Sequence, residues 1–143
     1  MVSSTFLLKQ DSNRDTGEKL RVYYAHAICL YDTKRERKEV RLIRERFKDA
    51  KIINPCDYQN NSSMDFYLRL VDTCQIVVFS CILGKITSGV GKEVNYALNK
   101  GKEVYLLYNE KRFFPMKFPV NYISRKCTIE LYQKWYQQQK SKT

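Results

Sequence analysis

The sequence predicts an α/β fold in which a parallel sheet of four to five strands carries helices on both faces. Short apolar segments with strand character alternate with longer segments whose apolar residues recur at helical spacing. The strand-like segment at residues 75–80 is nearly all apolar, as expected of a strand that is covered on both faces. The spacing of these segments suits right-handed crossovers between parallel strands. The predicted class is a flavodoxin/Rossmann-like doubly wound sheet.

The first half of the chain supplies two strands and two helices of this fold. Residues 20–25 form the first strand. Residues 33–49 form a helix, because apolar residues recur there at positions i, i+3 and i+7. A short strand at residues 51–54 is closed by Pro55. Residues 65–73 have their apolar side chains spaced along one face and form the second helix.

The second half continues the alternation after the apolar strand. A helix that begins after a pair of glycines covers residues 93–100 and ends at a further glycine, a common helix stop. Residues 104–108 form the fourth strand. Two prolines make residues 109–119 a loop, and residues 121–123 then add a short edge strand. Residues 128–140 form the final helix.

Length and composition fit one folded domain. Of the 143 residues, we expect 1–19 to be a polar N-terminal extension and 20–143 to be a single α/β domain. No apolar stretch approaches the roughly 20 residues of a membrane span, and the N-terminus lacks a signal-peptide pattern. We therefore expect a cytoplasmic protein with no membrane partner. The five cysteines are scattered, with no C-x-x-C pair, so we expect reduced thiols, no metal site and no cofactor.

The most informative segment follows the apolar strand. Gly89 and Gly91 lead into a helix that carries Glu93 in its opening turns, and a helix N-terminus presents backbone N–H groups that can hold an anion. Thr87 and Ser88 can donate hydroxyls to a phosphate. A purely structural interpretation is also open: Glu93 and the two hydroxyls can cap the helix, and the glycines can form a tight strand-to-helix turn.

The carboxyl ends of the strands are expected to form the walls of a pocket, because ligands bind there in open parallel sheets. Three loops therefore supply the candidate residues: 25–33, 54–61 and 81–93. In the first loop, His26 is either a polar pocket contact or a partly buried residue at a strand end.

The pattern Gly89-Val90-Gly91-x-Glu93, with Ala97 four residues later, resembles the nucleotide-cleaving branch of the nucleoside 2-deoxyribosyltransferase superfamily. In that family the matching glutamate is the nucleophile that attacks the anomeric carbon of a deoxyribose. The resemblance implies this role for Glu93, and it implies a nucleoside or nucleotide as the small-molecule partner.

The resemblance extends to two further loops within residues 20–108. The first is similar to the family's opening loop, which contacts sugar and base, so Tyr31 and Asp32 are expected to border the substrate. Ala25 and His26 stand where nucleotide hydrolases of this kind carry a phosphate loop with glycine and arginine, so the resemblance does not extend to the family's 5'-phosphate contact. The second loop includes Asp57, which ordinary turn chemistry also explains.

The chemistry gives each candidate residue a role. Cleavage of an N-glycosidic bond builds positive charge on the sugar ring, which a carboxylate such as Glu93 can stabilise or trap as a covalent intermediate. The leaving base needs a proton or a hydrogen bond, and a second carboxylate with a raised pKa can supply it. Tyr31 or Tyr24 can hold the Glu93 carboxylate or stack on the base. The candidates for the second carboxylate are Asp32, Asp57, Asp65 and Asp72.

Net charge leaves further functions open. The chain carries a formal charge of +11 and has a pI near 9.5, which favours anionic partners without ranking them. The basic segment at residues 34–51 can be a solvated helix face or a nucleic-acid surface. Three hypotheses follow: an N-glycosidase or deoxyribosyltransferase-like enzyme, a nucleotide-binding module without catalysis, and a small basic nucleic-acid-binding protein.

Aromatic residues in the final helix bear on assembly. Leu131, Tyr132, Trp135 and Tyr136 form a stripe that fits either core packing or the centre of an interface. Relatives in the superfamily commonly oligomerise, so we expect a homodimer.

Overall fold

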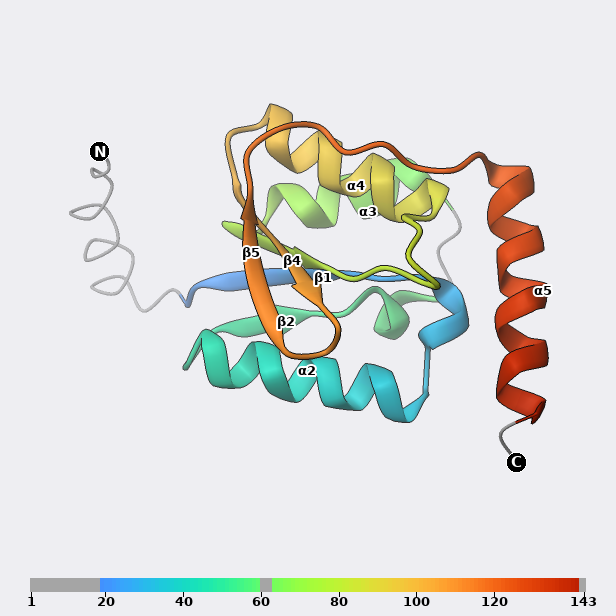
Figure 1. Ribbon diagram of the computed structural model, residues 1–143. Helices are drawn as coiled ribbons and strands as arrows, with labels where there is room; N and C mark the ends of the chain where they lie inside the picture. Colours follow the sequence, from blue (N-terminus) through green and yellow to red (C-terminus); the bar gives the residue numbers. More distant parts are fainter. Residues whose placement is uncertain (1–18, 60–62, 142–143) are drawn as a thin grey trace.

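The computed structural model describes residues 19–59 and 63–141 and shows a sheet with helices on both of its faces (Figure 1). The sheet has the strand order β2-β1-β3-β4-β5. Neighbouring strands are parallel except β4 and β5, which are antiparallel. This arrangement confirms the predicted doubly wound α/β class. The strands are β1 (Arg21–Ala25), β2 (Lys51–Ile53), β3 (Ile76–Phe79), β4 (Glu103–Tyr108) and β5 (Arg112–Met116).

The helices take up three positions around the sheet (Figure 1). Helix α2 (Lys34–Arg46) covers one face, and α3 (Met64–Asp72) and α4 (Ser88–Asn99) cover the other. Helix α5 (Arg125–Ser141) stands beside the carboxyl ends of the parallel strands, where it contacts α4 and the short 3₁₀ helix η1 (Ile28–Leu30). None of the helices in the described part of the chain is long and apolar enough to cross a membrane.

Strand β1 separates the two main cores of the protein. Successive side chains of a strand point to opposite faces. Val22 and Tyr24 therefore pack with Ile43 on the α2 side, while Tyr23 and Ala25 pack with a second apolar cluster on the α4 side. All four of these β1 residues are fully buried. A third cluster lies under α5, where Trp135 packs with buried residues of the η1 region.

The prediction for residues 109–123 was wrong. The segment predicted as a loop contains β5, which forms a hairpin with β4 through a turn at Asn109 and Glu110, both at positive φ. Pro115 is tolerated because β5 is an edge strand, with no further neighbour in the sheet to need its missing N–H. The expected edge strand at residues 121–123 does not form. The chain there instead crosses α4, and Val120, just before this segment, exchanges two hydrogen bonds with the Asn95 side chain, at 2.7 and 3.0 Å.

The glycine pair also takes a different place from the one predicted. Helix α4 begins at Ser88, with Thr87 in an extended conformation as its N-cap, so Gly89 and Gly91 belong to the helix rather than to a preceding loop. A Cβ atom at position 91 would lie 2.2 Å from Cδ2 of Tyr122. Gly91 is therefore required because the segment between β5 and α5 packs directly on the helix backbone.

Candidate active site

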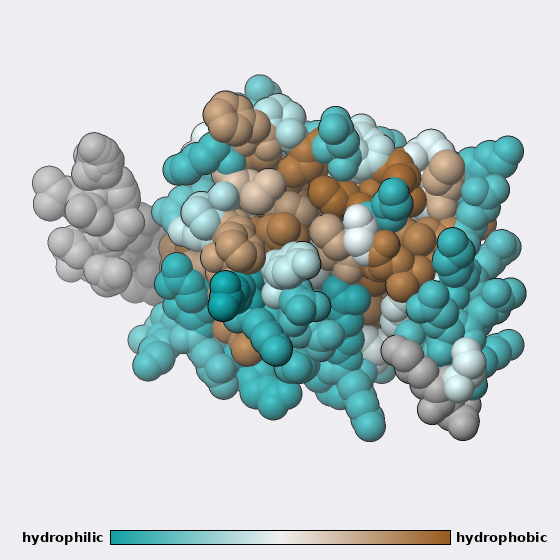
Figure 2. All heavy atoms as spheres, in the orientation of Figure 1, coloured by the Kyte–Doolittle hydropathy of each residue, from teal (hydrophilic) through white to brown (hydrophobic). Residues whose placement is uncertain are grey.

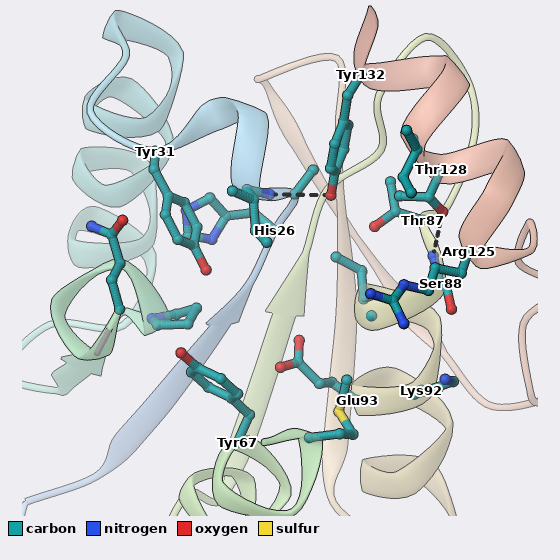
Figure 3. Close-up of a pocket in the computed structure, with 18 residues that line it drawn as sticks. His26, Tyr31, Tyr67, Thr87, Ser88, Lys92, Glu93, Arg125, Thr128 and Tyr132 are labelled. Atoms are coloured by element: carbon teal, nitrogen blue, oxygen red, sulfur yellow. Dashed lines mark hydrogen bonds between the residues drawn. The ribbon is translucent and has the colours of Figure 1, made fainter. Parts of the chain in front are cut away.

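A cavity of about 580 Å³ opens at the carboxyl ends of β1 and β3 (Figure 3). Its size is typical of small-molecule sites, which span about 300 to 1,000 Å³. The lining residues come from four places: the segment after β1, the segment from the end of β2 through the first turn of α3, the first turns of α4, and the first turns of α5. The cavity thus lies where ligands bind in open α/β sheets.

Glu93 is the buried carboxylate of this cavity. Its side chain leaves the second turn of α4 and points into the cavity, although only 7% of the residue is exposed (Figure 3). The hydroxyl of Tyr23 donates a hydrogen bond to Oε2 of Glu93 at 2.6 Å. Burial raises the pKa of Glu93 to about 8, and the bond from Tyr23 acts in the opposite direction. No lysine, arginine or histidine of the described residues forms an ion pair with it.

Three tyrosines surround the space in front of Glu93. Tyr31 follows η1, Tyr67 belongs to α3 and Tyr132 to α5, and in Figure 3 all three rings face the cavity. Burial, followed by the charge of Glu93, raises the pKa of both Tyr31 and Tyr67. Burial also raises the pKa of Tyr132. The three phenols are therefore neutral and weakly acidic near pH 7, and they offer flat aromatic faces.

His26 is held at the wall of the cavity by its own hydrogen bonds. Its ring stacks on Tyr24 with centroids 3.7 Å apart. Nδ1 lies 3.0 Å from the Tyr24 carbonyl and Nε2 lies 2.7 Å from Oε2 of Glu36. Both ring nitrogens therefore have a buried hydrogen-bond partner within the protein. Burial raises the pKa of Glu36, but the bonds from His26 and from the Asp32 N–H outweigh burial and lower it overall.

The opposite wall joins α4 to α5. The backbone N–H of Ser88 donates to Oγ1 of Thr128 at 3.0 Å, so α5 rather than the Thr87 side chain satisfies this end of α4. Arg125, at the start of α5, is exposed and directs its guanidinium group toward the cavity (Figure 3). Lys92 also lies at the rim. The mouth of the cavity therefore carries positive charge.

The structure brings six of the predicted site residues together in the cavity wall. They are His26, Tyr31, Thr87, Ser88, Gly89 and Glu93.

Four more of the predicted site residues lie outside the cavity wall. Ala25 is buried within the sheet, and Gly91 packs against the linker that leads to α5. Asp32 faces Glu36, and Asp57 is exposed in the 3₁₀ helix η2 (Pro55–Tyr58).

The two remaining aspartates considered as a second acid are also elsewhere. Asp65 is exposed in the first turn of α3, and Asp72 accepts hydrogen bonds from the Tyr96 hydroxyl at the other end of that helix. Of the second pocket loop, residues 60 and 61 lie outside the described residues, as do residues 1–18 of the expected extension.

Several residues of the site were not expected from the sequence. Tyr23 and Tyr24 are neighbours in a strand, so their side chains point to opposite faces of the sheet. This alternation is the sequence signal from which a contact of Tyr23 with α4 could have been inferred. The sequence pattern indicates Tyr132 only as part of the aromatic stripe of the final helix. For Tyr67 and Arg125 the sequence offers no signal, because their place in the cavity depends on how α3 and α5 dock.

One group of possible metal ligands lies next to the cavity wall. Ligand atoms of Asp32, Glu36 and Cys56 lie within 4.8 Å of one another. Both Glu36 oxygens already accept hydrogen bonds, from His26 and from the Asp32 N–H. Burial, together with the nearby Glu36 and Asp32 charges, raises the pKa of the Cys56 thiol to about 11. The polar atoms of this group therefore already have hydrogen-bond partners within the protein.

The fold and the site define a doubly wound α/β protein with a ligand cavity in which Glu93 is the buried carboxylate among the described lining residues. No family model and no curated protein matches the chain. The structure is similar to the crystal structure of a conserved protein from Enterococcus faecalis V583, with a TM-score of 0.50 and 17% sequence identity. The match covers 81% of this chain and 87% of that one. At this identity the likeness concerns the fold, and it agrees with the doubly wound class.

Proposed function

We propose that this protein cleaves the N-glycosidic bond of a nucleoside or nucleotide and that Glu93 is the carboxylate that acts on the sugar. The observation that carries the proposal is the position of Glu93, a buried carboxylate that points into a cavity of ligand size and has no counter-ion among the described residues. The resemblance of residues 89–97 to the nucleotide-cleaving branch of the deoxyribosyltransferase superfamily supports the same role.

The geometry around Glu93 suits attack on an anomeric carbon. Tyr23 holds Oε2, which fixes the carboxylate and leaves Oε1 available to a substrate in the cavity. As the bond to the base breaks, positive charge grows on the sugar ring, and a carboxylate within reach stabilises it or bonds to C1'. Water then attacks C1' and completes hydrolysis, or a second base does so and completes transfer.

The rest of the cavity suits the remaining parts of such a substrate. The faces of Tyr31, Tyr67 and Tyr132 can pack on a base, because aromatic rings favour offset stacking. Arg125 can pair with a phosphate at the mouth, since its planar guanidinium matches phosphate oxygens. The proposal therefore includes nucleotides among the substrates, with the phosphate contact made from α5 rather than from the loop after β1.

The test is product analysis by chromatography after incubation with deoxynucleosides, ribonucleosides and their 5'-monophosphates. Three proteins are compared: the wild type, Glu93→Gln, and Glu130→Gln as a matched change on the exposed side of α5. We expect free base from the wild type and from Glu130→Gln, and none from Glu93→Gln. Equal release by all three proteins would contradict the role of Glu93.

A second candidate function is nucleotide binding without cleavage, and the raised pKa of Glu93 favours it. With a pKa of about 8, the carboxyl is mostly protonated at pH 7 in the empty cavity, so it can donate a hydrogen bond to a sugar or base oxygen. Isothermal titration with the same compounds separates the two functions. Stoichiometric binding with no product over hours would favour the binding module.

Two surfaces away from Glu93 bear on nucleic-acid binding and on assembly. The basic residues of α2 lie on the far side of the sheet, and none of them lines the cavity, so nucleic-acid binding there is a separate proposal.

Figure 2 shows apolar side chains gathered on one face, and Phe114, Phe118 and Ile129 are among the exposed apolar residues. In α5, Trp135 faces the core and Tyr136 is 47% exposed. The homodimer stays a prediction, which sedimentation velocity tests.

A further inference from the structure

We infer that the substrate of this site is an N-glycoside whose leaving base is a pyridinium ring, so that the base departs as a neutral molecule without receiving a proton. The inference rests on the proposed function and names its substrate class. It comes from the single carboxylate of the cavity and from the absence, among the described residues, of a suitable second acid beside it.

Purines and neutral pyrimidines are poor leaving groups unless an acid protonates or hydrogen-bonds them. Glu93 cannot serve as that acid while it acts on the sugar as a carboxylate. It is the one carboxylate among the described residues that line the cavity. The aspartates that the sequence offered as a second acid all lie elsewhere and are exposed, and Asp72 is bonded to Tyr96.

The remaining polar groups of the wall are badly placed to replace a carboxylic acid. Both ring nitrogens of His26 are held by buried partners, the Tyr24 carbonyl and Glu36, so turning the ring to a substrate would break one of these hydrogen bonds. The tyrosines that face the cavity have raised pKa values and are therefore weak acids. The Lys92 side chain leaves α4 on the side away from the Glu93 carboxylate (Figure 3).

The electrostatics of the cavity favour a cationic ring next to Glu93. A positive charge near a buried carboxyl stabilises its ionised form, so a bound pyridinium nucleotide would lower the pKa of Glu93 and release its proton to solvent. Aromatic faces attract cations, and Tyr31, Tyr67 and Tyr132 supply such faces. The positive mouth at Arg125 and Lys92 suits the phosphate that such a nucleotide carries at its other end.

The reaction balances without a further acid. The bond from C1' to the ring nitrogen breaks, and its electron pair stays on the nitrogen, which changes from a cation to a neutral pyridine. Oε1 of Glu93 bonds to C1'. Water then attacks C1', the bond to Glu93 breaks with its electron pair returning to the carboxylate, and one water proton passes to solvent. The products are a free sugar phosphate, the neutral base and one proton.

The experiment compares base release from three 5'-monophosphates: oxidised nicotinamide mononucleotide, its reduced dihydropyridine form, and adenosine monophosphate. The reduced form is the matched control, because it keeps the shape and the phosphate but lacks the ring charge. We expect release from the oxidised form to be at least about 100-fold faster than from either uncharged substrate, within the range by which acid catalysis helps a leaving group. Glu93→Gln should lose this release, and Glu130→Gln should keep it.

The outcomes separate the substrate class from the proposed function. Adenine released as fast as nicotinamide, with both lost in Glu93→Gln, overturns the pyridinium inference and leaves Glu93 as an N-glycosidase carboxylate. No base from any of these substrates, or from the nucleosides tested above, overturns both. Nicotinamide released equally by the wild type and by Glu93→Gln also overturns both. Thermal unfolding of each variant confirms that the folded proteins are being compared.

Discussion

Two buried glutamates lie on opposite faces of the sheet, and each accepts a hydrogen bond from a tyrosine of β1. On the α2 face, Glu39 is fully buried and accepts from the hydroxyls of Tyr24 and Ser80 and from Nε of Arg35, the latter two at 2.9 and 3.0 Å. On the α4 face, Glu93 accepts from Tyr23, and its other side faces the cavity.

The difference shows how a structural carboxylate and a reactive one can arise from the same strand. A buried carboxylate is stable when a cation and hydrogen bonds compensate for the lost hydration. Glu39 has both kinds of partner. Glu93 has one neutral donor among the described residues, so burial raises its pKa to about 8. Groups perturbed in this way inside a cavity are candidates for functional sites, because the missing partner can be a ligand.

The largest expected effect is on activity at Glu93. Replacement of Glu93 by Gln removes the nucleophile while keeping its shape and its capacity to accept from Tyr23. We expect kcat/KM for base release to fall by about 10³-fold or more, as for the loss of a catalytic nucleophile in other hydrolases. The measurement is initial rate against substrate concentration. A residual activity above a tenth of the wild type would show that Glu93 does not act on the sugar.

Next is the effect of pH on stability. The folded pKa of Glu93, about 8, lies above its ordinary value of 4.5, so the folded protein keeps a proton that the unfolded chain loses. Stability contributed by this group is therefore full below pH 4.5 and is lost as pH rises toward 8, by up to about 4 kcal/mol. Urea unfolding at pH 5 and pH 8 should show that the free energy of unfolding of Glu93→Gln rises relative to that of the wild type as pH rises. A constant difference would show that Glu93 is ionised throughout.

Replacement of Glu39 should lower stability and leave activity unchanged. Glu39→Gln leaves the Arg35 guanidinium without its carboxylate partner, and disruption of a buried ion pair costs about 3 kcal/mol. We expect a lower urea midpoint but unchanged kcat/KM per folded molecule, because Glu39 does not line the cavity. Loss of activity in the folded variant would show that the two faces of the sheet are coupled.

The smallest effect is expected from the two tyrosines. Tyr23→Phe removes the hydrogen bond that lowers the pKa of Glu93, so this pKa should rise. Because kcat/KM rises with pH as the nucleophile ionises, its pH profile should shift to higher pH. The lost hydrogen bond should lower the free energy of unfolding by about 1 kcal/mol. Tyr24→Phe is the matched control on the α2 face. It should lower stability by a similar amount and leave the pH profile in place, and a shift in both variants would contradict a specific role for Tyr23.

Much of the central sheet could be predicted because its signals are local. The apolar run before Ser80, the helical period in α2 and the glycine after α4 each reflect which side chains are buried or which backbone angles are allowed. The same local logic placed His26 and Tyr31 in the segment after the first strand and Glu93 in the opening turns of the helix after the apolar strand, and all three line the cavity. The hairpin of β4 and β5 was missed because two prolines argue against a strand unless it lies at an edge.

The sequence by itself determined the alternation of strands and helices and the presence of Glu93 at the start of α4, since both follow from periodicity and short-range backbone chemistry. Only the tertiary structure decided that Glu93 has no second carboxylate near it in the described cavity wall and that α5 adds Arg125 and Tyr132. The physical reason is that these positions depend on contacts between distant segments. Tyr122 against Gly91 and Thr128 against the Ser88 N–H are such contacts, and no local pattern encodes them.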